Sequence, residues 1–202
     1  MSITVEVRGG LGSRLRSMIS AMCLAEDLGK SLQVIWSPNH PECMARFETL
    51  FDITKLPSWV AVSMTGTSTL ILLPSPPHIT AQWLKHLRAL QPFATPIVEP
   101  NTIGVHLRKD AEPMIELMKT YTDAHFIVAT DLNSVRTAIK NKFGPRVTFY
   151  ATSLTRMTQQ GMLGALADFV ALSKCTEILE NTKSSFSEMA ALYGNVVVKT
   201  RL

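Results

Sequence analysis

Residues 5–16, VEVRGGLGSRLR, constrain the fold most, because a short apolar strand there passes through a glycine-rich turn directly into a helix. Glycines allow positive φ and bring backbone N–H groups close to a ligand. The first N–H groups of a helix lack partners within it and favour an anion. The turn is therefore either a phosphate-binding loop assisted by Arg14 or Arg16, or only the tight connection that a parallel sheet needs. The two arginines favour the phosphate loop.

Predicted strands and helices alternate along the chain, which is typical of parallel α/β sheets. Apolar residues at helical spacing run from Leu15 to Leu28, and a short apolar run at 32–36 predicts the next strand. Prolines at 92, 96 and 100 mark a candidate junction between two lobes. We predict an α/β fold of two small Rossmann-like lobes with parallel sheets, residues 1–95 and 96–202.

The individual elements follow from the same patterns. Beyond the first βαβ unit, the patterns predict helices at 45–51, 81–90, 114–122, 132–143, 161–174 and 185–193, and strands at 59–63, 69–73, 103–107, 125–129, 147–150, 177–179 and 196–198.

Composition narrows the class of protein. The chain has 202 residues, of which 46% are hydrophobic and 18% charged, as expected for a compact soluble protein. The net charge of +4 is small and scattered, so we expect no nucleic-acid partner. Apolar runs such as that at 70–73 are far shorter than the roughly 20 residues of a membrane span. With no signal-peptide pattern and three widely spaced cysteines, which we expect to be reduced thiols, a cytoplasmic location is expected.

Polar residues that follow predicted strands are the candidate site residues, because ligands bind beyond the carboxyl ends of strands in open α/β sheets. His106 and Arg108 fall on one strand face, and Arg108 could grip a diphosphate. The alternative is a structural Arg108–Asp110 ion pair beside a buried His106. Asp131 could accept from ribose hydroxyls, or it could cap the helix that begins at residue 132.

Two further candidates lie near the end of the chain. Asp168 interrupts an apolar helix, so it either faces a ligand donor or points to water. Ser185 and Glu188 have capping-box spacing, and the same helix start could also present amides to a phosphate. Asp-x-Asp and Gly-x-Ser-x-Gly motifs are absent, the opening glycine loop lacks Gly-Lys-Ser/Thr, and the histidines lack metal-ligand spacing.

Taken in order, these segments resemble the fucosyltransferase superfamily: GGLGSRLR at 9–16, GVHLR at 104–108, ATD at 129–131, Asp168, and SSF at 184–186. That superfamily includes core, protein O- and rhizobial nodulation fucosyltransferases. The resemblance implies a GT-B arrangement and inverting, metal-independent transfer of fucose from GDP-fucose. It implies no cofactor, a GDP-sugar donor, and a glycan or other hydroxyl acceptor.

Site roles carry over by position. The resemblance places the donor on residues of the C-terminal lobe: Arg108 on the β-phosphate, Asp168 on the guanine edge, and His106, Asp131, Ser184, Ser185 and Phe186 around the nucleotide. It makes the N-terminal lobe the acceptor side, from which Gly10, Gly12 and Arg14 close over the diphosphate. Lys109 and Ser13 stand where the family commonly has arginine and asparagine, so a GDP-sugar is the broader expectation and fucose the narrower one.

The expected mechanism is electrostatic stabilisation of the departing diphosphate by Arg108 and Arg14. Glu112 and Glu116 are the nearest carboxylates in sequence to serve as general base, and the choice between them stays open. The alternative function is a non-catalytic nucleotide-binding or scaffold protein with a degenerate glycosyltransferase fold. A nicotinamide-dependent oxidoreductase ranks last, because a suitably placed acidic residue is missing.

Overall fold

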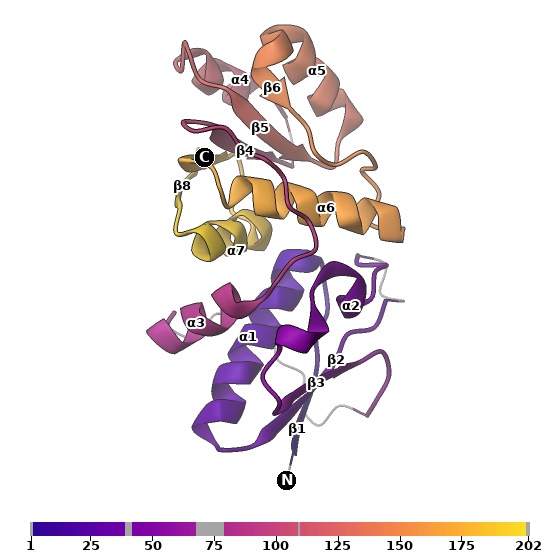
Figure 1. The fold of residues 1–202 in the computed structure, drawn as a ribbon. Helices are drawn as coiled ribbons and strands as arrows, with labels where there is room; N and C mark the ends of the chain where they lie inside the picture. The colour runs from indigo at the N-terminus through magenta and orange to yellow at the C-terminus, as the bar shows by residue number, and fades with distance from the viewer. Residues whose placement is uncertain (1, 39–41, 68–78, 109, 201–202) are drawn as a thin grey trace.

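The computed structural model describes residues 2–38, 42–67, 79–108 and 110–200. Within them the chain forms two parallel sheets, one of three strands ordered β1-β2-β3 and one of five ordered β6-β5-β4-β7-β8 (Figure 1). The strands are β1 (Ser2–Glu6), β2 (Ser31–Ile35), β3 (Val60–Ser63), β4 (Ile103–Leu107), β5 (Phe126–Thr130), β6 (Val147–Thr148), β7 (Glu177–Glu180) and β8 (Val197–Thr200).

Helices complete both lobes. They are α1 (Leu11–Asp27), α2 (Phe47–Leu50), α3 (Ala81–Ala89), α4 (Glu112–Lys119), α5 (Asn133–Phe143), α6 (Gln159–Leu172) and α7 (Ser185–Gly194), with short 3-10 turns at Ile53–Lys55 and Gly144–Arg146. Every pairing between the strands of the described residues is parallel, as the alternation of elements predicts.

The five-stranded sheet is covered differently on its two faces. Val105 and Leu107 point to the side of α4 and α5 and share a core with Met114 and Ile139. On the opposite face Gly104 leaves room for α6, since a Cβ there would lie 2.8 Å from the side chain of Leu172. Strand alternation therefore directs residues 104 and 106 of β4 toward α6 and α7.

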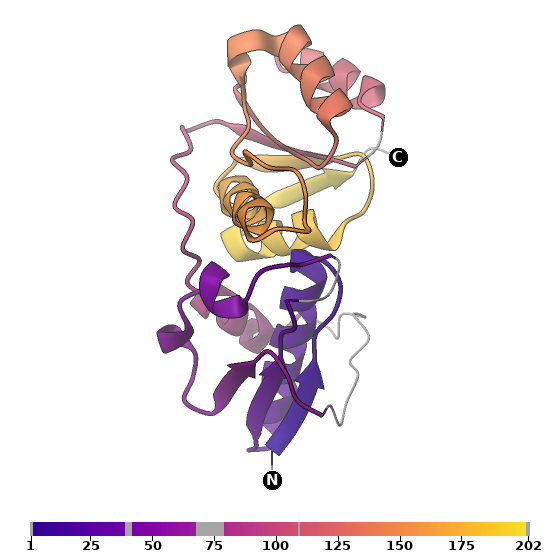
Figure 2. The ribbon, with the colours of Figure 1, turned by 90° about the vertical axis from the view of Figure 1, so that its right-hand side faces the viewer.

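Helices α6 and α7 form a layer between the five-stranded sheet and the N-terminal lobe (Figures 1 and 2). A single apolar cluster runs through this layer, from Val5 and Leu15 in the N-terminal lobe to Phe169 and Met189 in the C-terminal one. Helix α7 also contacts both α1 and α3. The two lobes are therefore packed against each other through a continuous core.

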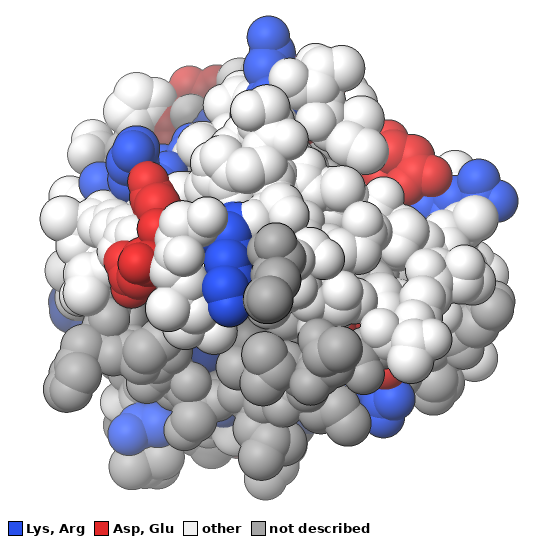
Figure 3. Space-filling model, turned by 90° about the horizontal axis from the view of Figure 1, so that it is seen from below, with Lys and Arg blue, Asp and Glu red and all other residues white. Residues whose placement is uncertain are grey.

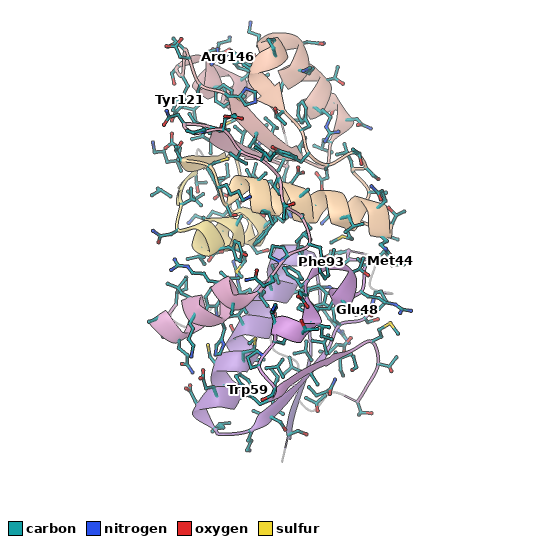
Figure 4. All side chains as sticks on the ribbon, in the orientation of Figure 1. Met44, Glu48, Trp59, Phe93, Tyr121 and Arg146 are labelled. Atoms are coloured by element: carbon teal, nitrogen blue, oxygen red, sulfur yellow. The ribbon has the colours of Figure 1, made fainter. Side chains whose placement is uncertain are left out.

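The connection between the lobes spans residues 90–102 and forms hydrogen bonds with both lobes. Phe93, beside α2 in Figure 4, donates its N–H to the carbonyl of Leu50 at 3.0 Å. Farther along, Lys174 Nζ donates to the carbonyl of Pro96 at 2.8 Å. The proline-spaced segment thus follows the surface of both lobes.

Several predicted boundaries differ from the structure. The helix expected at 114–122 begins at Glu112, because Pro113 fits the first turn of a helix, where its missing N–H costs nothing. The helix expected at 45–51 covers only Phe47–Leu50. The strand expected at 69–73 lies outside the described residues.

The surface carries mixed charge. In the view from below, lysines and arginines lie among acidic and uncharged residues on the described surface (Figure 3). In the described part of the chain, helices that combine the length and apolar character of a membrane span are absent.

Candidate functional site

Two adjoining pockets lie where the lobes meet. We call the first the sheet-edge pocket; it lies at the carboxyl ends of β4 and β5. We call the second the interlobe pocket; it lies between the glycine turn and the start of α7. The pockets share four lining residues, which are Arg108, Arg156, Ala165 and Phe186.

The glycine turn brings two helix starts together. A Cβ on Gly12 would lie 2.5 Å from the carbonyl oxygen of Ser185 and 2.6 Å from the backbone nitrogen of Phe186. The hydroxyls of Ser13 and Ser185 lie 3.1 Å apart, and Arg16 pairs with Glu188 of α7. Since Gly10, Gly12 and Ser185 line the interlobe pocket, the positive ends of α1 and α7 meet at one place.

Arg108 follows β4 and is positioned by its backbone. Its N–H donates to Asn181 Oδ1 at 3.3 Å, and Asn181 Nδ2 donates to the carbonyl of Asp110 at 3.1 Å. Asp110 itself accepts from the backbone N–H of Glu112. Among the described residues Arg108 and Asp110 form no ion pair, so that part of the structural alternative is wrong, whereas its buried His106 is confirmed. The exposed Arg108 side chain faces both pockets.

Asp131 lines the sheet-edge pocket and accepts from Arg156 Nη2 at 3.3 Å. The alternative that it caps the next helix is wrong. Helix α5 begins at Asn133, its N-cap is Leu132, and that end has no side-chain cap. Thr130 Oγ1 instead accepts from the N–H of Leu132. The Asp131 carboxylate is therefore engaged by a second arginine at the pocket.

His106 is buried in a chain of hydrogen bonds behind the sheet-edge pocket. Ser187 Oγ donates to Glu180 Oε2 at 2.5 Å, and His106 Nδ1 lies 3.0 Å from the same hydroxyl. Because the Ser187 proton points to Glu180, His106 must donate from Nδ1. Burial, assisted by the charge of Arg108, lowers the pKa of His106 to about 3. The imidazole is therefore neutral, with Nε2 left as a hydrogen-bond acceptor.

Ser187→Ala is expected to lower the free energy of unfolding by about 1–3 kcal/mol, because it leaves two buried polar groups, His106 Nδ1 and a Glu180 oxygen, without this partner. Urea unfolding of both proteins measures the difference. The control is Ser58→Ala, an exposed serine outside both pockets. Equal stability of Ser187→Ala and the wild type would contradict the proposed hydrogen-bond chain.

Asp168 faces the sheet-edge pocket, so the alternative of a water-facing side chain is wrong. The side chain is buried, and its Oδ1 accepts from the N–H of Ala151 at 3.1 Å. Burial raises the pKa of this carboxyl to about 7, and the Ala151 amide and the charge of Arg136 oppose the rise only partly. Asp168 is thus a carboxylate held at a pocket wall with capacity for further donors.

Arg14 lies beneath the glycine turn instead of in either pocket. It is fully buried, its Nε donates to the carbonyl of Gly9 at 2.8 Å, and its guanidinium lies 5.1 Å from the ring centre of Trp36. Burial lowers the pKa of Arg14, and both terminal nitrogens lack hydrogen-bond partners among the described residues. In this structure Arg14 supports the turn from behind.

Other predicted residues are divided between the pockets and their surroundings. Phe186 lines both pockets, whereas Ser184 caps α7 by accepting from the N–H of Phe186. The cap expected at Ser185 is therefore one residue too late, and Glu188 pairs with Arg16 instead of closing a capping box. Glu112 and Glu116 lie on α4, and neither lines either pocket.

Sequence reasoning missed the loop between β6 and α6. Arg156 in that loop lines both pockets, and the same rule about strand ends, applied after residues 147–150, would have pointed to it. Ser187 and Glu180 are also absent from the sequence-based set, because only the pairing of β4 with β7 brings Glu180 beside His106. Within the described residues, groups of three or more His, Cys, Asp or Glu suited to a metal ion do not occur.

Comparison with known proteins supports the fold. Neither protein-family models nor curated proteins match the chain. Among solved structures, the fucosyltransferase NodZ from Bradyrhizobium matches with a TM-score of 0.64 and 16% identity, over 94% of this chain and 93% of that one. POFUT1 in complex with GDP matches with a TM-score of 0.65 and 12% identity, over 98% and 97%. A NodZ α-1,6-fucosyltransferase soaked with GDP-fucose matches with a TM-score of 0.64 and 16% identity, over 96% and 93%.

These likenesses extend over nearly the whole chain. The chain therefore has a fucosyltransferase-like fold, and the predicted α/β class with two parallel sheets of the GT-B type is confirmed. At this level of identity the likeness concerns the fold, so the chemistry must be argued from the pockets.

Proposed function

We propose that this protein is a glycosyltransferase that moves a sugar, with fucose as the specific candidate, from a GDP-sugar to a hydroxyl acceptor. The observation that carries the proposal is the convergence of Arg108, Arg156 and two helix starts where the two pockets join. Such an arrangement suits a diphosphate. The fold-level likeness to proteins solved with GDP and GDP-fucose supports a guanine nucleotide as its carrier.

The nucleoside is proposed to occupy the sheet-edge pocket. Asp168 there can accept the two N–H groups on the edge of guanine, and the ring of Phe186 supplies an apolar wall. The neutral His106 offers Nε2 as an acceptor to a ribose hydroxyl. The diphosphate then lies toward the interlobe pocket, and the sugar faces the glycine turn.

The proposed reaction is inverting and uses no metal. The acceptor oxygen forms a bond to the anomeric carbon, and the bond from that carbon to the β-phosphate oxygen breaks. The leaving diphosphate takes the electron pair, and Arg108 and the two helix starts stabilise its growing charge. The acceptor proton needs a base, and Glu42 is the carboxylate that lines the interlobe pocket. Glu112 and Glu116, outside both pockets, are less well placed.

A thermal-shift screen across nucleoside diphosphates and nucleotide sugars tests the donor, because a ligand of the native state raises its apparent stability. We expect GDP and GDP-fucose to raise Tm more than adenine, uridine or cytidine diphosphates. Indifference to every guanine nucleotide would overturn the assignment. GDP binding without transfer to any glycan and without hydrolysis of GDP-fucose would favour the non-catalytic alternative.

GDP affinity is expected to depend on pH through Asp168, whose carboxyl has a pKa of about 7 in the free protein. The N–H donors of guanine favour the ionised form of Asp168, so the pKa of Asp168 falls in the complex. Binding below pH 7 therefore releases a proton. The affinity should therefore weaken as pH falls below 7, by up to about tenfold per unit. Calorimetry at pH 6 in buffers of different ionisation enthalpy measures the released proton.

Two controls isolate this effect. Guanosine lacks phosphate groups, so it should show the same dependence without titration of a phosphate. Asp168→Asn should bind guanosine weakly and release no proton. If the affinity of the wild type for guanosine stays constant from pH 5.5 to 8, a carboxylate that accepts hydrogen bonds from guanine is contradicted.

A further inference from the structure

Arg156 reaches across the junction of the two pockets. It comes from the loop between β6 and α6, whereas Arg108 comes from the end of β4. A Cβ on Gly10 would lie 3.6 Å from Arg156 Nη1, and Nη2 lies 3.3 Å from Asp131 Oδ2. One guanidinium therefore extends between the glycine turn of the N-terminal lobe and the edge of the C-terminal sheet.

The backbone of Arg156 is held by both lobes. Its carbonyl accepts from the N–H of Met44 at 3.1 Å, and Met44 lies near the level where the lobes meet (Figure 4). On the other side, the carbonyl of Thr155 lies against Gly161 at the start of α6, where a Cβ would come within 1.6 Å of that oxygen. The backbone of the loop at Arg156 is thus held by two separate contacts.

The Arg156 side chain itself is only loosely held. It is 39% exposed, and its partner Asp131 is 34% exposed. Ion pairs of this kind between half-exposed groups contribute little, so exchanging the carboxylate for a more highly charged anion costs little. A terminal diphosphate offers more charge and more acceptor oxygens than one carboxylate does.

We propose that Arg156 is a second diphosphate ligand that acts with Arg108 and makes the site prefer a nucleoside diphosphate over the monophosphate. This inference rests on the proposed function and extends it. Arg108 grips the diphosphate from the C-terminal sheet, and Arg156 leaves Asp131 to bind it from the opposite loop. The two guanidinium groups together surround the β-phosphate, which a nucleoside monophosphate lacks.

Calorimetry of guanosine, GMP and GDP with the wild type, Arg156→Ala and Arg156→Lys tests the assignment. Arg156→Ala should weaken GDP binding at least tenfold and leave guanosine binding within twofold, so the preference for GDP over GMP shrinks. Arg156→Lys keeps the charge without the planar guanidinium group, so its GDP affinity should lie between those of the wild type and Arg156→Ala.

The control is Arg46→Ala, an exposed arginine that lines neither pocket. A wild type that binds no guanine nucleotide would overturn the proposed function itself. If the wild type and Arg156→Ala prefer GDP over GMP by the same factor, only this inference is overturned. Equal loss of guanosine and GDP would also overturn it, because Arg156 would then act by shaping the pocket. If Arg156→Ala fails to fold, the affinities of Arg156→Lys for GDP, GMP and guanosine provide the same test.

Discussion

Arg108→Ala is expected to slow release of GDP from GDP-fucose by about 10²–10³-fold, the loss typical of removing one donor to a developing oxyanion. The reason is its position, since the side chain faces both pockets and no ion pair among the described residues engages it. The measurement is the turnover of GDP-fucose, with a glycan acceptor or with water, at saturating donor.

Arg108→Lys is the matched variant, because it keeps the charge and loses the bidentate geometry. We expect it to recover part of the rate. If Arg108→Ala kept turnover within about tenfold of the wild type, the barrier would have changed by less than about 1.4 kcal/mol. The catalytic role of Arg108 would then be wrong, whatever its contribution to binding.

Gly12→Ala is expected to destabilise the protein by about 1–3 kcal/mol, the usual cost of forcing extra atoms into a packed contact. The added Cβ would lie within 2.6 Å of backbone atoms of Ser185 and Phe186, and backbone cannot move aside as a flexible side chain can. The starts of α1 and α7 must then separate, which also weakens the contact between the Ser13 and Ser185 hydroxyls. GDP affinity should therefore fall together with stability.

Gly10→Ala is the stability control for this substitution. Gly10 has φ −71°, and among the described residues only Arg156 Nη1, at 3.6 Å, lies near its added Cβ, so the native backbone accommodates alanine there. Urea unfolding of the two variants and a thermal-shift titration of Gly12→Ala with GDP provide the readouts. Equal stability of Gly12→Ala and Gly10→Ala would show that the helix starts do not need this close contact.

The sequence predicted most of the features that depend on residues close together in the chain. Buried strands such as Ile103–Leu107 are short apolar runs, and the alternation of strands and helices determines parallel pairing, so the fold class was readable without coordinates. His106, Arg108, Asp131 and Asp168 could be selected as site candidates, because the rule about strand ends and the cost of burying a charge both act locally.

The tertiary structure decided which of several similar residues reach the pockets. Arg14 and Arg156 are equally basic in sequence, yet packing of α1 buries Arg14 against Trp36, and the loop before α6 brings Arg156 to the glycine turn. Likewise the pairing of β4 with β7, and not any motif, places Glu180 behind His106. Local patterns determine elements and their faces, but long-range packing determines which charged side chain meets which, because those contacts join residues far apart in the chain.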